Sequence, residues 1–208
     1  MSKKISWIIL GILSSLIGLY PIIYFIIDRH FGLLSTKTKV LLTSTLWNIG
    51  FYGHIIFGGI ALLIGWMQFN PKLRNSNLKL HRTIGKTYMF SVGISGTCSL
   101  YIAYYATGGI ISSIGFASLG LIWLSTTFFA LKAIKRGNIK LHQKLLIYSY
   151  AACFGAVTLR IWLPILTSLM GSFNKAYPFV AWISWVPNVI VAYFITRKLD
   201  KQSYNNAF

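Results

Sequence analysis

Long apolar runs separated by short polar connections dominate the chain. Several of these runs approach or exceed the roughly 20 residues that a helix needs to cross a bilayer. Helices satisfy their own backbone hydrogen bonds inside the apolar layer, so the pattern predicts an all-α, multi-pass membrane bundle. Six transmembrane helices are predicted, at residues 5–27, 40–67, 82–105, 110–131, 145–169 and 178–196. Together they predict one transmembrane domain over residues 1–208, with a short basic tail at 197–208.

The polar connections are unevenly charged. The chain has 20 Lys and Arg residues and only two acids, Asp28 and Asp200, for a net charge of +18. Fifteen of the basic residues lie at the N-terminus, in the second and fourth connections and in the tail, and only four lie in the other connections. The positive-inside rule therefore predicts that both termini are cytoplasmic. Placement in the connections assigns the charge to topology and not to nucleic-acid binding.

Composition agrees with a membrane protein. Hydrophobic residues make up 55% of the chain and the mean hydropathy is +0.64. Only 11% of the residues are charged, against about a quarter in soluble domains. Both cysteines, Cys98 and Cys153, lie inside apolar runs, which favours small buried residues over a disulfide or a zinc site.

A short phrase occurs twice along the chain. "NLKLH" runs over residues 77–81, and "NIKLH" follows 61 residues later, over residues 138–142. Each copy follows a basic connection and opens a helix that returns outward. The repeat unit is then a hairpin, the second helix with the third and the fourth with the fifth, and the two hairpins form a parallel repeat.

The phrase has a structural and a functional interpretation. In the structural one, Asn caps the helix, Lys extends to the headgroups and His tolerates the interface. In the functional one, His81 and His142 share one depth on two helices and bind the iron of a b-type haem between them. The sequence leaves both interpretations open.

Two polar residues lie deep inside predicted spans. Counting along the helices places His54 roughly 20 Å and Arg160 roughly 22 Å above the cytoplasmic rim. An intramembrane arginine is costly and by default indicates a functional site. We therefore predict a ligand pocket in the outer half of the membrane, lined by His54 and Arg160. Asp28 is expected to close it, with two further residues of the second helix nearby, Asn48 and Tyr52.

Three stretches of the chain carry a family resemblance: "GHIIFGGIALLIGWMQF", "LHRTIGKTY" and "HQKLLIYSYAACFGAVTLRIWLP". They resemble a bacterial family of predicted membrane proteins catalogued as a domain of unknown function, over roughly residues 47–164. Its more specific elements map to His81, Arg82, Gly85 and Tyr88, and to Thr158, Leu159 and Arg160. The resemblance implies a bacterial cytoplasmic (inner) membrane protein and brings no activity with it. A looser architectural similarity is to cytochrome b561-like haem bundles.

Three functions are compatible with these features. The first is binding of haem b at His81 and His142, with electron transfer in the membrane. The second is binding or transport of a lipid, quinone or other anionic amphiphile at His54 and Arg160. The third is non-catalytic assembly of another membrane protein complex. No nucleophile–base constellation, phosphate loop or zinc motif indicates a hydrolase or ATPase. Whether a reaction is catalysed, and the oligomeric state, stay open.

Overall fold

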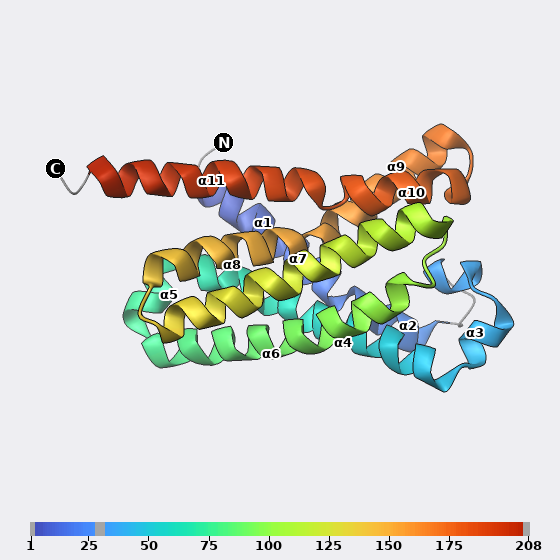
Figure 1. Cartoon of the computed structure of the whole chain (residues 1–208), viewed down its shortest axis with the longest axis horizontal. Coiled ribbons are helices and arrows are strands. Elements are labelled where there is room, and N and C mark those ends of the chain that lie inside the picture. Colours follow the sequence, from blue (N-terminus) through green and yellow to red (C-terminus); the bar gives the residue numbers. More distant parts are fainter. Residues whose placement is uncertain (1–2, 28–31, 206–208) are drawn as a thin grey trace.

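The computed structural model describes residues 3–27 and 32–205, and the side chains of residues 4–27 and 32–200. Over this part of the chain the fold is all-helical, with no strand (Figure 1). Short helices occupy the connections: η2 (Gly32–Thr36), α3 (Lys39–Thr43), η3 (Trp66–Phe69) and α5 (Pro71–Ser76). The bundle itself consists of α1 (Lys3–Leu19), η1 (Tyr20–Ile22), α2 (Ile23–Ile26), α4 (Thr45–Gly65), α6 (Leu78–Ala103), α7 (Gly109–Lys135), α8 (Ile139–Cys153), α9 (Gly155–Met170), α10 (Phe173–Ile183) and α11 (Val186–Asn205).

Five helical segments of the described chain are long and apolar enough to cross a membrane, where the sequence pattern predicted six. They are Lys4–Ile26, Thr45–Phe69, Gly109–Lys135, Ile139–Met170 and Phe173–Asp200. The predicted third span corresponds to α6, which has 26 residues but is not among the five. Serine, threonine and glycine dilute the apolar residues of α6, and basic residues occupy its first turns. It nevertheless packs lengthwise against α4 and α7 inside the bundle.

Prolines and local breaks divide several spans. Pro21 lies in η1, a 3₁₀ turn that interrupts the first span between α1 and α2. The fifth span changes from α8 to α9 at Phe154, and the sixth from α10 to α11 just before Pro187. A proline is tolerated in the first turn of a helix because its missing N–H has no partner there. Pro164 lies inside a continuous α9.

The two ends of the bundle differ. α5, the α7–α8 connection and the C-terminal end of α11 lie toward one end, and α3 and the α9–α10 connection lie toward the other (Figure 1). Both copies of the repeated phrase begin helices at the first end. The side-chain oxygen of Asn77 accepts from the Leu80 N–H at 2.9 Å, and that of Asn138 accepts from the Leu141 N–H at 3.0 Å. The asparagines therefore cap α6 and α8.

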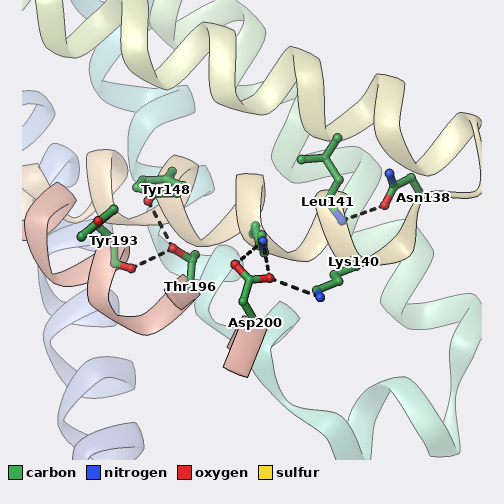
Figure 2. A network of polar contacts seen from close by, with 8 residues as sticks. Asn138, Lys140, Leu141, Tyr148, Tyr193, Thr196 and Asp200 are labelled. Atoms are coloured by element: carbon green, nitrogen blue, oxygen red, sulfur yellow. Dashed lines mark hydrogen bonds and ion pairs between the residues drawn. The ribbon is translucent and has the colours of Figure 1, made fainter. Parts of the chain in front are cut away.

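Polar contacts hold α11 against α8 (Figure 2). The Thr196 hydroxyl donates to a carbonyl of its own helix, so it accepts from the Tyr148 hydroxyl at 3.2 Å. One turn further along α11, a carboxylate oxygen of Asp200 lies 2.5 Å from Lys144 Nζ and 3.2 Å from Lys140 Nζ. The C-terminal helix is thereby tied to the first turns of α8.

Candidate functional site

Arg160, on α9, is the central residue of the candidate site. Its guanidinium carbon lies 4.4 Å from the centre of the Tyr20 ring, in a cation–π contact. Nη1 donates to the Ala156 carbonyl of the same helix at 2.9 Å. Nε is buried with no hydrogen-bond partner among the described residues. A guanidinium has five N–H donors, so this one still has donors to offer to a ligand.

Tyr20 reaches α9 because of the turn around Pro21. The break in the first span sets Tyr20 and Tyr24 edge to face, with ring centres 5.9 Å apart. A close crossing of α1 and α4 lies just before this turn. A methyl group on Gly59 of α4 would lie 2.6 Å from the carbonyl oxygen of Gly18, so only glycine permits the approach. The turn therefore lies between α4 and α9.

His54, on α4, is held in one tautomer. Its Nδ1 lies 3.0 Å from the Ser95 hydroxyl oxygen and 3.2 Å from the Ser95 carbonyl oxygen. The Ser95 hydroxyl donates its own proton to the His54 carbonyl at 2.8 Å, so Nδ1 must be the donor to Ser95. Nε2 then carries the lone pair and can accept a hydrogen bond or ligate.

The charge of Arg160 acts on the groups around it. Arg160 interacts electrostatically with His54, with Tyr24 and with Tyr177 of α10. Tyr177 is buried and stacks on Phe173 with ring centres 4.7 Å apart. The structure thus brings His54 and Arg160 into one electrostatic neighbourhood and adds three tyrosines that the sequence analysis did not name. The Tyr-Pro pair at residues 20–21 was the available signal for the first of them.

The other residues expected at this pocket have different surroundings. The Asn48 side chain donates to the carbonyls of Leu42 and Ser44, both at 2.8 Å, where α3 meets α4. Tyr52 packs against Phe25, with ring centres 5.2 Å apart. Asp28 lies outside the described residues.

The two histidines of the repeated phrase are electrostatic neighbours. Nδ1 of His142 lies 2.9 Å from the Ala130 carbonyl, which can only accept, so Nε2 carries the lone pair. His81, whose carbonyl accepts from the Gln68 amide at 3.1 Å, has a buried Nδ1 with no partner among the described residues. His142 acts on His81 electrostatically. Within the described part of the chain, no group of three or more metal-ligating side chains occurs.

A closed circuit of hydrogen bonds lies in the core between α6, α7 and α8. Thr127 donates to the Trp123 carbonyl at 2.7 Å, so it accepts from the Ser149 hydroxyl at 2.7 Å. Ser149 in turn accepts from the Tyr88 hydroxyl at 2.7 Å, and Tyr88 accepts from the Trp123 indole at 3.3 Å. The circuit begins and ends on Trp123 and all four side chains are buried. Tyr88, the last residue of the "HRTIGKTY" element, therefore joins three helices.

Comparison with known proteins agrees with this architecture. The profile of a family described as predicted membrane proteins (DUF2306) matches residues 51–196. The chain belongs to this family. The match spans α4 to α11 and contains both copies of the repeated phrase, the hydroxyl circuit and Arg160. The looser similarity to cytochrome b561-like haem bundles is not shown. No curated protein and no solved structure matches the chain.

Proposed function

We propose that the protein binds a membrane-dissolved amphiphile whose polar head carries acceptor oxygens, with Arg160 as the principal donor. The observation that carries the proposal is the buried Nε of Arg160, which has no partner among the described residues. His54 and Tyr24 interact electrostatically with Arg160, and Tyr20 contacts it with its ring, so these residues supply further polar groups to the site. An anionic head is favoured over a neutral one because of the arginine's charge.

Energetics support a ligand at this position. An arginine at the centre of a spanning helix costs about 2.5–3.5 kcal/mol on insertion scales. The cation–π contact with Tyr20 offsets about 2 kcal/mol of this cost when it is desolvated. The hydrogen bond to Ala156 uses only one of the five guanidinium donors. Of the two carboxylates in the chain, Asp200 pairs with Lys140 and Lys144, and Asp28 lies outside the described residues. Ligand oxygens would supply the remaining compensation.

Depth narrows the class of ligand. Arg160 lies ten residues before the end of α9 at Met170, which is about 15 Å along the helix. That is roughly half of a 30 Å hydrocarbon core. The polar head of a ligand at Arg160 would therefore lie deeper in the membrane than the lipid headgroups. This depth favours a mobile lipid, a fatty acid or a quinone over a lipid that stays in its leaflet.

Mass spectrometry of the protein purified in mild detergent tests the proposal. The wild type should retain a stoichiometric amphiphile, and Arg160→Gln should lose it, with affinity falling roughly 10- to 100-fold for the lost charged hydrogen bonds. Arg160→Lys should retain part of the binding because an ammonium lacks the planar fork. The mass of the ligand distinguishes an anionic lipid from a quinone.

Arg197→Gln is the matched control. Arg197 also lies over a tyrosine ring, at 5.6 Å from the centre of Tyr193, but it is exposed. This variant should keep the amphiphile. A wild type that carries no more amphiphile than Arg160→Gln would refute the proposal and favour the assembly-partner function.

The histidine pair supports haem b as a second candidate. The observation in its favour is the buried, unpartnered Nδ1 of His81 beside His142, whose Nε2 is available as a ligand atom. Haem would supply one-electron chemistry, and His81 and His142 would only hold the iron. A reduced-minus-oxidised spectrum of haem-supplemented protein that lacks a b-type signal would eliminate this candidate.

We infer that the protein resides in a bacterial cytoplasmic membrane with both termini inside, an orientation that requires α6 to cross the membrane beside α4 and α7 as a sixth segment. The charge asymmetry supports this orientation, because the connections that carry fifteen of the basic residues include α5 and the α7–α8 connection. These lie toward one end of the bundle, with the end of α11 (Figure 1).

A further inference from the structure

A groove follows the last two turns of α7, at the inferred cytoplasmic end of the bundle. It has a volume of about 350 Å³ and is lined by Phe128, Leu131, Lys132, Lys135 and Arg136. The spacing of these residues places them on one face of the helix. Phe128 is 62% exposed, so this face is directed away from the protein core.

The lining of the groove changes from apolar to cationic at the depth where the hydrocarbon core of a membrane meets the lipid headgroups. Phe128 lies 19 residues after the start of α7 at Gly109, or about 28 Å along the helix. The hydrocarbon core is about 30 Å thick. Phe128 and Leu131 therefore lie beside the carbonyl ends of the acyl chains, and Lys132, Lys135 and Arg136 lie at the level of the phosphates.

The three cations have no acidic partner among the described residues. Lys132 is three residues from Lys135 and four from Arg136, spacings at which like charges on a helix repel one another. The C-terminal end of α7 attracts them weakly. Among described residues the only carboxylate is Asp200, and it is bound by Lys140 and Lys144 of α8. A phosphate group between the three side chains would attract each of them and offset their mutual repulsion.

We propose that this groove is a binding site for one anionic phospholipid of the cytoplasmic leaflet. The phosphate lies among Lys132, Lys135 and Arg136, and an acyl chain packs along Leu131 and Phe128. The site is separate from Arg160, which lies on a different helix, α9, about half-way through the hydrocarbon core, so neither proposal depends on the other. Phe128 and Leu131 form an apolar surface beside the cations, which favours a lipid over a free phosphate ion, because an inorganic ion has no apolar part to pack against Phe128.

Lipid titration of delipidated protein, followed by native mass spectrometry, tests this site. The probes are dioleoyl phosphatidylglycerol and dioleoyl phosphatidylcholine, which have the same chains and differ in net charge. We expect phosphatidylglycerol to bind at least tenfold more tightly to the wild type. Replacing Lys132, Lys135 and Arg136 together with Gln should reduce its affinity roughly 10- to 100-fold and abolish the preference.

A matched triple variant controls for total charge. Lys72→Gln, Arg74→Gln and Lys79→Gln likewise remove two lysines and one arginine, from α5 and the first turn of α6, where all three are exposed. This control should keep the preference for phosphatidylglycerol. Phe128→Ala should weaken both lipids alike, since it removes only the chain contact. Thermal midpoints of all variants should match the wild type, because none of these side chains lies in the core.

Three results would overturn the proposal. The first is equal binding of the two lipids by the wild type. The second is an equal loss of preference in the two triple variants, which would indicate general electrostatic attraction. The third is complete displacement of phosphatidylglycerol by millimolar inorganic phosphate with no effect of Phe128→Ala, which would indicate an ion site.

Discussion

At the scale of single residues, the most constrained side chains form the buried hydrogen-bond circuit of Trp123, Tyr88, Ser149 and Thr127. Every donor in it has one acceptor, and the last acceptor is the carbonyl of the first residue. A circuit that closes on itself leads to neither surface of the membrane. We therefore assign it to joining α6, α7 and α8 and not to proton transfer.

Removing one hydroxyl from the circuit should therefore lower the stability of the protein. Tyr88→Phe leaves the Trp123 indole N–H without an acceptor and Ser149 without its donor. Each buried unsatisfied group costs about 1–3 kcal/mol, so the thermal midpoint in detergent should fall clearly. Tyr104→Phe is the control, since Tyr104 is 80% exposed. Equal midpoints for the two variants would contradict the role assigned to the circuit.

Lys37, in the connection before α3, should make stability depend on pH. Its Nζ donates to the Tyr105 carbonyl at 2.5 Å and to Thr107 Oγ1 at 3.0 Å, and burial lowers its pKa to about 8. Between about pH 8 and the ordinary lysine value near 10.4, the unfolded chain binds more protons than the folded one. Stability attributable to Lys37 therefore increases with pH across that window.

Unfolding midpoints measured from pH 7 to pH 10 test this prediction. The difference between wild type and Lys37→Met should change in favour of the wild type as the pH rises above 8. Lys39→Met replaces an exposed neighbour and should show no such trend. Parallel pH curves for wild type and Lys37→Met would rule out a lowered pKa at this position.

At the scale of helices, the crossing of α1 and α4 positions the candidate site. Gly59 approaches the backbone at Gly18, one turn before Tyr20 and Pro21. Any side chain at Gly59 must separate the two helices. Since Tyr20 contacts Arg160, a shift of α1 would also alter the surroundings of the guanidinium.

Gly59→Ala should therefore destabilise the protein and weaken amphiphile binding together. Overpacking of this kind costs about 1–3 kcal/mol. Gly93→Ala is the matched control on α6, because a methyl group there meets no atom within 4 Å. The control should be neutral or stabilising, as alanine favours a helix more than glycine does. A Gly59→Ala protein with wild-type stability and wild-type ligand content would exclude the crossing as a positioning element.

At the scale of the whole molecule, orientation can be measured directly. In a background of Cys98→Ser and Cys153→Ala, single cysteines replace Asn75, Lys135 and Asn174, which are all exposed. An impermeant thiol reagent applied to intact cells should label only position 174. The other two should react after the membrane is opened. Labelling of positions 135 and 174 from the same side would refute the inferred topology.

Local pattern was sufficient for much of the architecture. Membrane class and helical structure depend on hydropathy and on backbone rules that act within a few residues. The caps at Asn77 and Asn138 are equally local, because each asparagine bonds the N–H three residues ahead. The predicted count of six spans is one more than the five that meet the criterion of length and hydropathy, because serine, threonine and glycine dilute the apolar residues of α6 and basic residues occupy its first turns.

The sequence by itself therefore determined that this is an all-helical membrane protein, and it singled out Arg160 and His54 as polar residues deep inside predicted spans. Only the tertiary structure decided what those residues meet. The contact of Arg160 with Tyr20 spans 140 positions of the chain, and the circuit through Tyr88 and Ser149 spans 61. Such partners depend on how helices rotate and cross, at points such as Gly18 and Gly59. Hydropathy along one helix carries no information about rotation relative to another.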